Sequence, residues 1–327
     1  MNWSRFFDSL IEYSFYFLLF TVPLILTPYN FELFEYNKMM LVYFMTVIIV
    51  GAWIGKGIIS RQVSIQRTPL DMPIILFLAS QLIPTIFSID VHTSIWGYYS
   101  RFHGGLLSTI SYILLYYAFV SNMTKTQNSK VKSQKYNAKL KDKQSNNETI
   151  KQSNNKVFNC LYILLASAAL VTFYGILEHF GIDAKYWVQD VRNRVFSTLG
   201  QPNWLGAWID ALILIPIAMI LAINSKHEAR NSKQYLNSNV SNLKLFGILD
   251  FRNLNLFRIS NLGFRISIYY LLFTLFYLCL LFTGSRSAYI GFLAALGVFL
   301  ALNLVFKSSV NTWKTIGLFL GGIILIA

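Results

Sequence analysis

Long apolar runs, separated by polar stretches, dominate this chain. A helix needs about 20 mostly apolar residues to cross the hydrocarbon core of a bilayer. That window predicts eight complete transmembrane helices, near residues 11–28, 39–59, 70–89, 104–122, 157–180, 203–224, 267–284 and 287–306. A ninth run begins near Thr315 and is cut off at Ala327, which leaves a truncated span or a re-entrant segment. The pattern therefore predicts an all-α, polytopic integral membrane helix bundle, one transmembrane domain over residues 1–327 that is incomplete at its C-terminus.

The composition supports a membrane protein. Only 13% of the residues are charged and 55% are hydrophobic, whereas a soluble domain carries about 25% charged residues. Both cysteines, Cys160 and Cys279, lie at or within apolar runs, so they imply neither a disulfide framework nor a metal site. The segment before the first span is short and polar, and the span itself is interpreted as an uncleaved anchor.

The formal net charge of +14 is explained by topology. When the spans alternate from a cytoplasmic N-terminus, most lysines and arginines fall inside, including those of residues 125–156 and the seven basic residues between Lys226 and Arg265. Retention of positive charge on the cytoplasmic side is the usual rule for cell-membrane proteins. The basic residues left outside are Lys38, Arg101, Lys185, Arg192, Arg194 and Arg286. The charge thus predicts a multi-pass orientation and gives no reason to expect a nucleic-acid partner.

Two predicted cytoplasmic loops are long. Residues 123–156 are rich in lysine and asparagine and nearly devoid of apolar anchors, which predicts a disordered loop. Residues 225–266 form a basic loop, and from Leu243 to Arg265 leucine, phenylalanine and isoleucine are mixed with lysine and arginine. Such a mixture predicts a partly interfacial segment that lies on anionic membrane lipids.

The outward-facing arginines are the candidate functional residues. Arg286 lies between two apolar runs, and a guanidinium at membrane depth needs water or an anionic partner. Arg101, Arg192 and Arg194 fall on the same side, and Asn203 is placed to cap the sixth span, whose N-terminus favours an anion. Two interpretations stay open: interfacial arginines whose head groups reach the lipid headgroups, or a cavity for a phosphate-bearing lipid that planar, five-donor arginines would bind.

A few polar residues lie deeper in the spans. Asp210 follows Asn203 by two helical turns, and a carboxylate there is costly unless it is paired, so it is either a structural partner or a proton carrier. Glu178 and His179 end the fifth span, where they are either solvated or functional. The chain has no glycine-rich phosphate loop, no HExxH and no CxxC motif. We therefore predict no metal and no cofactor.

Three stretches resemble a known family, the O-antigen ligase and O-antigen polymerase superfamily, which includes bacterial O-oligosaccharyltransferases. Residues 194–207 read RVFSTLGQPNWLGA and are similar to the family's arginine and glycine-x-proline-asparagine stretch. Residues 283–291 read TGSRSAYIG and are similar to its serine-arginine motif. Residues 28–43 read PYNFELFEYNKMMLVY and resemble the opening of many members.

The resemblance implies a membrane glycosyltransferase of polysaccharide biosynthesis in the cell envelope. Such an enzyme transfers a glycan from a polyprenyl-diphosphate carrier to a lipid, glycan or protein acceptor on the extracytoplasmic face, without a metal or nucleotide sugar. By similarity, Arg194 and Arg286 hold the donor diphosphate, with Arg192 and Arg101 as auxiliaries. Their role would be electrostatic stabilisation of the departing diphosphate.

The resemblance assigns no catalytic residue in this chain. The family carries an acceptor-activating histidine in a large outer loop late in the chain, which is expected beyond Ala327. None of the four histidines matches that motif: His92, His103, His179 and His227. The chain is therefore expected to be inactive alone, and ligase, polymerase and protein oligosaccharyltransferase are not distinguished.

A function from another class is a polysaccharide or lipid flippase, or another secondary transporter. A transporter needs broken helices and charged residues near the bilayer midplane, facing a central pathway. Asp210 is the one candidate for such a residue, whereas the arginines gather on one side. That asymmetry favours the glycosyltransferase.

Overall fold

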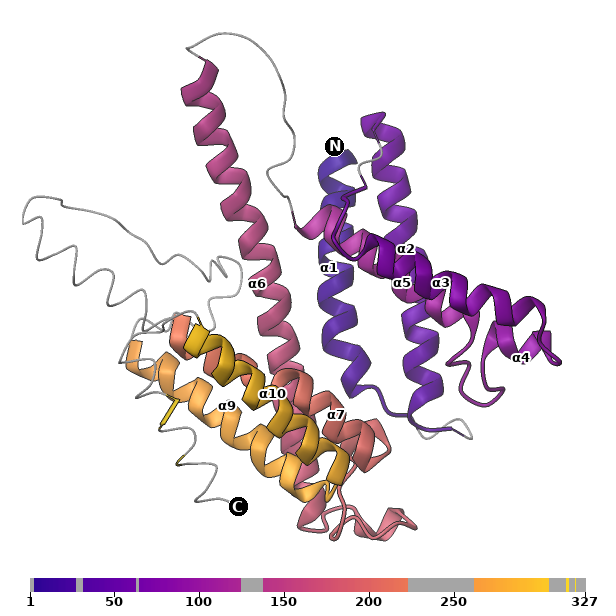
Figure 1. Cartoon of the computed structure of the whole chain (residues 1–327), viewed down its shortest axis with the longest axis vertical. Helices are drawn as coiled ribbons and strands as arrows, with labels where there is room; N and C mark the ends of the chain where they lie inside the picture. The colour runs from indigo at the N-terminus through magenta and orange to yellow at the C-terminus, as the bar shows by residue number, and fades with distance from the viewer. Residues whose placement is uncertain are drawn as a thin grey trace, which may run out of the picture. The chain divides into compact units, whose positions relative to one another are not determined.

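A computed structural model describes residues 3–27, 32–62, 65–124, 138–222, 262–305, 316–317 and 321, and the structure in these ranges is helical with no strand (Figure 1). The helices are α1 (Trp3–Leu24), α2 (Glu35–Ser60), α3 (Asp71–Ile86), α4 (Val91–Trp96), α5 (Leu106–Met123), α6 (Ala138–His179), α7 (Pro202–Leu212), α9 (Leu262–Phe282) and α10 (Arg286–Val305), with 3₁₀ turns η1 (Ala184–Tyr186) and η2 (Ser197–Leu199). The single predicted transmembrane domain divides into two compact units, Met1–Ser167 and Ala168–Ala327.

Six helices within the described ranges are long and apolar enough to cross a membrane: Trp3–Leu24, Glu35–Ser60, Leu106–Met123, Asn155–His179, Pro202–Ala222 and Arg286–Val305. Two shorter apolar helices, Asp71–Ile86 and Ile266–Phe282, fall at the other predicted spans. Large side chains on the helices stay exposed, such as Val47 (72%) and Ile290 (69%). Apolar surface on this scale is what a bilayer covers. The predicted ninth span lies outside the described residues except for 316–317 and 321.

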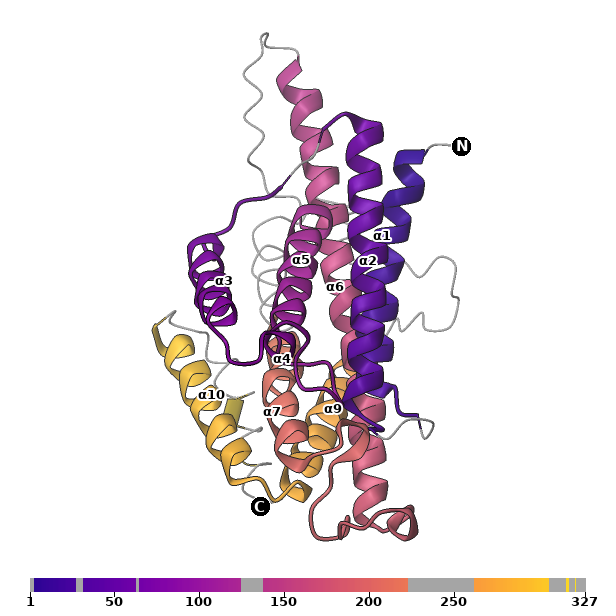
Figure 2. The ribbon, with the colours of Figure 1, turned by 90° about the vertical axis from the view of Figure 1, so that its right-hand side faces the viewer.

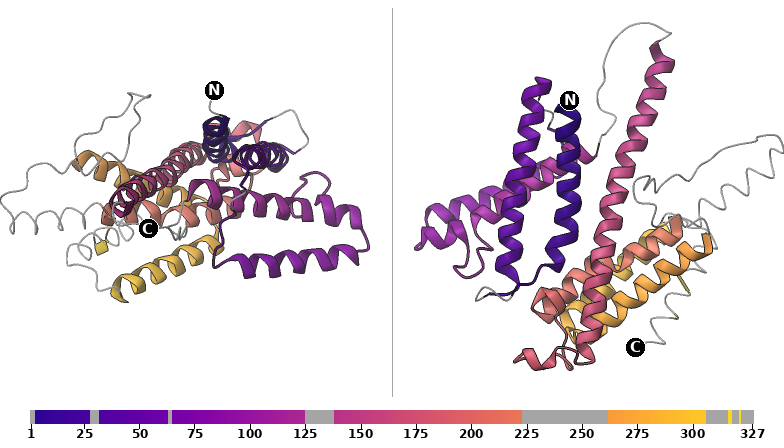
Figure 3. Two further views of the ribbon diagram at one scale, coloured as in Figure 1. Left: turned by 90° about the horizontal axis from the view of Figure 1, so that it is seen from above. Right: turned by 180° about the vertical axis from the view of Figure 1, so that it is seen from behind.

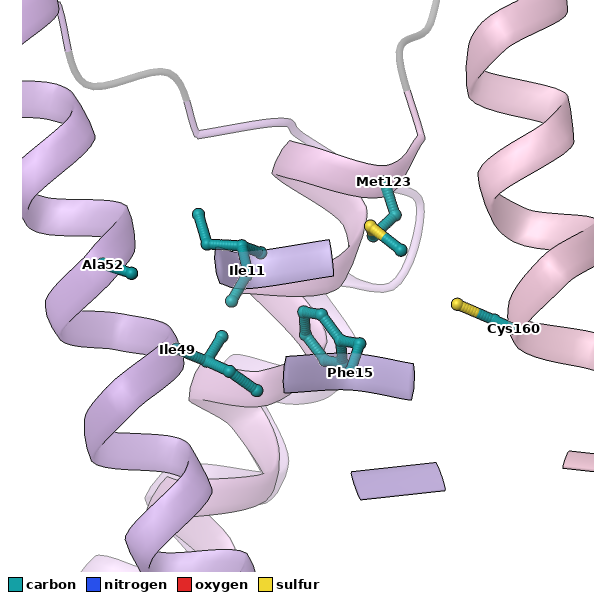
Figure 4. Close-up of a cluster of buried hydrophobic side chains, with 7 residues drawn as sticks. Ile11, Phe15, Ile49, Ala52, Met123 and Cys160 are labelled. Carbon is teal, nitrogen blue, oxygen red and sulfur yellow. The ribbon is translucent and has the colours of Figure 1, made fainter. Parts of the chain in front are cut away.

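The first unit is built on α1 and α2, which lie side by side (Figures 1 and 2). α5 packs against both, and the buried side chains between the helices form a cluster of Ile11, Phe15, Ile49, Ala52, Ala118, Met123 and Cys160 (Figure 4). Two ion pairs join helices that contribute to this cluster. Lys56 Nζ lies 2.6 Å from Asp8 Oδ1, and Lys156 Nζ lies 2.7 Å from Glu12 Oε2.

The predicted span at 70–89 is shorter in the structure. α3 ends at Ile86, and α4 begins after Asp90, whose carboxylate accepts the backbone N–H of Thr93 at 3.1 Å as a helix N-cap. Hydrogen bonds from Thr93 hold the pKa of the Asp90 carboxyl below its usual value. The backbone approaches closely at Gly105, where a Cβ would collide with the backbone of Gly97.

α6 differs from the sequence-based expectation. Residues 123–156 were predicted to be disordered, but the helix already begins at Ala138 and runs without interruption to His179. No glycine or proline occurs between Ala138 and Tyr174, and lysine, glutamate and glutamine are good helix formers. The helix of the apolar span therefore continues into the polar segment. Residues 125–137 lie outside the described residues, as do residues 225–261 of the predicted basic loop, whose last residues start α9.

The second unit packs α7, α9 and α10 side by side (Figure 3). Small residues bring the backbones close, as in other membrane helix pairs. A methyl group added at Gly206 of α7 would lie 2.5 Å from the Cβ of Ala288 in α10, and one added at Gly175 of α6 would lie 2.8 Å from Cys279 Sγ in α9. These close contacts place the N-terminus of α7 beside the turn between α9 and α10.

Candidate functional site

The turn between α9 and α10 is held by hydroxyl groups. Gly284 has φ +57°, a left-handed conformation that suits glycine. Thr283 Oγ1 donates to the carbonyl of Leu280 at 2.7 Å and accepts the N–H of Ser285 at 3.2 Å. Ser285 Oγ accepts the N–H of Ala288 at 3.4 Å, which makes Ser285 the N-cap of α10. These hydrogen bonds thus fix the conformation of the turn at the start of α10.

Arg194 is fixed against this turn. Its Nε donates to the carbonyl of Thr283 at 3.2 Å, and its Nη2 donates to Asn203 Oδ1 at 3.2 Å. Its Cγ would lie 3.3 Å from a Cβ at Gly284, so the side chain packs over the turn. The backbone N–H of the next residue, Val195, donates to the carbonyl of Phe282 at 3.1 Å. Two of the five guanidinium donors are used in this way, and the residue is exposed.

Asn203 has a different role from the predicted helix cap. α7 begins one residue earlier, at Pro202, with Gln201 in the N-cap position. Proline suits the first helical position because it lacks the N–H that would be unpaired there and its φ is already helical. Asn203 is therefore inside the first turn, where its amide oxygen accepts from Arg194. It orients an arginine instead of capping the helix.

Arg286 is the first residue of α10 and follows Gly284 by two positions. It is exposed and makes no hydrogen bond or ion pair with the residues that the structure describes. Within the same residues, Arg194 also lacks a carboxylate partner. A helix N-terminus adds unpaired N–H groups and a partial positive charge. Arg194 therefore packs over Gly284 and Arg286 follows Gly284 by two residues, so both belong to one turn at the start of α10, an arrangement suited to an anion.

Glu178, which the sequence left as solvated or functional, is fully buried. Its Oε2 accepts the backbone N–H groups of Phe196 at 2.9 Å and Ser197 at 2.7 Å. Ser197 has φ +52°, unusual for an L-residue, and its hydroxyl donates to the carbonyl of Val171 at 2.7 Å. The end of α6 thus holds the loop that carries Arg194.

Aromatic contacts lie within this loop and between the ends of α6 and α9 that flank it. The imidazole of His179 stacks on the ring of Phe282, with centroids 3.8 Å apart and planes 6° apart. Trp187 donates its indole N–H to Asp183 Oδ2 at 2.6 Å and packs edge-on against Phe196, with ring centroids 5.2 Å apart. His179 and Phe282 are far apart in sequence, so no local motif revealed their contact.

The side chains of Arg192 and Arg101 make their described contacts away from the turn between α9 and α10. The Nε of Arg192 would lie 2.5 Å from a Cβ at Gly181, so its side chain packs over the end of α6. Arg101, in the first unit, lies with Nε 3.3 Å from Glu35 Oε2 and its guanidinium carbon 5.9 Å from the ring centre of Tyr98. Of the predicted binding residues, the structure brings Arg194 and Asn203 together at the turn that leads into Arg286.

Asp210 has no arginine partner among the described residues. Its Oδ2 lies 2.6 Å from the position that a Cβ at Gly291 would take, so the carboxylate sits in the contact between α7 and α10. Its Oδ1 is buried without a hydrogen bond in the part of the chain that the structure describes. In those ranges no three histidine, cysteine, aspartate or glutamate side chains come together in a way that could hold a metal ion.

Comparison of the chain with family models, curated proteins and solved structures found no significant match. The chemistry of the site therefore rests on its own geometry. Fixed guanidinium donors, an uncompensated positive charge and a helix N-terminus can bind phosphate or diphosphate oxygens.

Proposed function

We propose that this chain is part of a membrane glycosyltransferase of the O-antigen ligase type. In this proposal it binds a polyprenyl-diphosphate-linked glycan and presents it for transfer to an acceptor on the extracytoplasmic face of the cell membrane. The eight-span topology with a cytoplasmic N-terminus belongs to the same proposal. Arg194 and Arg286 contact the diphosphate, and Asn203 holds Arg194 in place.

The observation that carries the proposal is the geometry of Arg194. Its guanidinium is held at two points, by a carbonyl and by an amide oxygen, and no carboxylate among the described residues neutralises it. An arginine that only reached the lipid headgroups would need neither contact. A fixed guanidinium with free donors matches the planar, bidentate recognition of phosphate oxygens.

The diphosphate leaving group explains why positive charge is needed. When the glycosidic bond to the carrier breaks, negative charge develops on the diphosphate oxygen. Fixed donors that point to this oxygen stabilise the transition state more than the ground state, which is how electrostatic catalysis lowers a barrier. The acceptor and the general base lie outside this proposal, since no histidine of the chain is assigned to that role.

The position of Asp210 favours this function over a transporter. A transporter of this kind needs a charged residue that lines a pathway at membrane depth. Asp210 instead lies in a helix contact, against Gly291. It fits a structural position better than a cargo site.

Binding of a polyprenyl diphosphate tests the proposal. The chain is reconstituted into vesicles with a polyprenyl diphosphate or the polyprenyl alcohol of equal length, and the affinity for each is measured. Arg194→Lys and Arg286→Lys keep the charge but lose the fork. Loss of hydrogen bonds to a charged group should weaken diphosphate binding by about 10- to 150-fold and leave alcohol binding unchanged.

Lys185→Ala is the matched control, because this exposed lysine lies in the same outer region and contacts the ring of Tyr186 at 4.9 Å. It should bind both lipids as the parent does. Equal diphosphate binding by the parent and both lysine variants would remove the proposed site.

A further inference from the structure

We propose that Glu178 is a positioning residue for Arg194, a role that rests on the proposed function of the arginine. Glu178 lies at the end of an apolar span, is 0% exposed and forms no ion pair with the residues that the structure describes. A carboxylate in such a place is costly unless hydrogen bonds or a charged partner stabilise it. In this role Glu178 holds the backbone that follows Arg194, and this fixes the direction in which the Arg194 side chain points from the loop.

The hydrogen bonds define the clamp. A single oxygen, Oε2, accepts the N–H groups of Phe196 and Ser197, at 2.9 and 2.7 Å, two and three residues after Arg194. On the other side of this segment, Val195 N–H donates to the carbonyl of Phe282. The loop is therefore fixed between the end of α6 and the end of α9, with Arg194 directly before the fixed segment.

Backbone strain shows that the loop needs this support. The φ of +52° at Ser197 is costly for a residue with a Cβ and persists only where the surroundings impose it. Glu178 accepts the N–H of the strained residue itself, and the Ser197 hydroxyl is bound to the carbonyl of Val171 on the same helix. Without the carboxylate, two buried N–H groups lose their acceptor and the strained conformation loses one of its two anchors.

Three substitutions of Glu178 distinguish the contribution of its hydrogen bonds from that of its charge and its size. Glu178 Oε1 is buried and has no hydrogen-bond partner among the described residues. A glutamine whose amide oxygen occupies the place of Oε2 can keep both backbone bonds. Glu178→Gln should therefore retain the clamp, whereas Glu178→Ala removes it. Glu178→Asp keeps the acid but is one methylene shorter, so it cannot reach both N–H groups.

Cleavage by trypsin measures the clamp directly, without any ligand. The protease cuts after Arg192 and Arg194 when this loop opens, and both residues are exposed. In the folded protein in detergent, Glu178→Ala and Glu178→Asp should be cut there at least about 10-fold faster than the parent, because two buried backbone N–H groups lose their acceptor or bind it more weakly. Glu178→Gln should be cut at nearly the parent rate. Asp210→Asn, a change at a second carboxylate of the same unit that lies against Gly291 of α10, is the control.

Binding of a polyprenyl diphosphate then tests whether the clamp acts through Arg194. Glu178→Ala should weaken binding, and the double variant Glu178→Ala/Arg194→Ala should bind no more weakly than Arg194→Ala alone. Additive losses, or cleavage at the parent rate in both the alanine and the aspartate variants, would overturn the positioning role. If Arg194→Ala binds like the parent while cleavage still responds to Glu178, the proposed function fails and the clamp stands.

Discussion

Gly206 should be the position where the smallest change has the largest effect on the site. A methyl group there would lie 2.5 Å from the Cβ of Ala288, a distance that real Cβ atoms do not adopt, and 3.6 Å from Thr283 Oγ1. α7 must therefore move away from α10 when Gly206 is replaced by alanine. Asn203 lies one turn earlier on α7, so its bond to Arg194, already 3.2 Å long, lengthens as the helix moves.

The magnitude follows from a comparison with Gly297 in α10, which has no atom within 4 Å of a Cβ position. Both Gly→Ala changes gain the same helix propensity, about 1 kcal/mol. Only Gly206→Ala pays for overpacking, at about 1–3 kcal/mol. The propensity gain cancels in the comparison, so Gly206→Ala should unfold at a lower Tm than Gly297→Ala by about 2–12 °C for a unit of this size.

Thermal unfolding in detergent and binding of a polyprenyl diphosphate form the assay. Gly206→Ala should lose stability and bind the diphosphate more weakly, whereas Gly297→Ala should retain both. Equal Tm values for the two variants would refute the close approach of α7 and α10. A lowered Tm with unchanged binding would show that the approach exists but does not support Arg194.

Two further predictions concern topology and the α7–α10 contact. In a cysteine-free variant, cysteines at Ser100 and Asp190 should react with an impermeant thiol reagent in intact cells and one at Ser64 should not; the reverse pattern would invert the proposed orientation. Gly291→Ala places a methyl group 2.6 Å from Asp210 Oδ2 and should lower the Tm by several degrees. The same change in an Asp210→Ser background should cost less, and additive effects would contradict the contact.

The apolar runs predicted the helices well, because in a membrane chain length and hydropathy decide where a helix forms. Each predicted span from 11–28 to 287–306 falls on a helix of the structure. The boundaries were less accurate where the deciding interaction is not hydrophobic. α6 extends back to Ala138 because helix propensity carries it into polar residues, and the third span stops where Asp90 caps a separate helix.

The site was predictable only in part. A charged residue between apolar runs is visible in a sequence, and this signal selected Arg286, whereas Arg194 was selected by its predicted outward position and by the family resemblance. The partners of Arg194 include a backbone carbonyl at Thr283, which carries no residue signature. Asn203 was read as a helix cap because sequence does not show that Pro202 already starts the helix. Glu178 gave a signal, an acid at the end of an apolar span, but its task depends on backbone N–H groups 18 and 19 residues away.

Arg194 and Arg286 differ in the freedom of their side chains, and this sets an order between them. Ordering a long side chain on binding costs about 0.5–1.5 kcal/mol. Arg194 has already lost this freedom on folding, through its bonds to Thr283 and Asn203, whereas Arg286 has no such bonds among the described residues. For equal contacts an anion gains about 2- to 12-fold more affinity from Arg194. In the proposed site Arg194 therefore contributes more of the affinity for an anion than Arg286 does, because only Arg286 must be ordered when the anion binds.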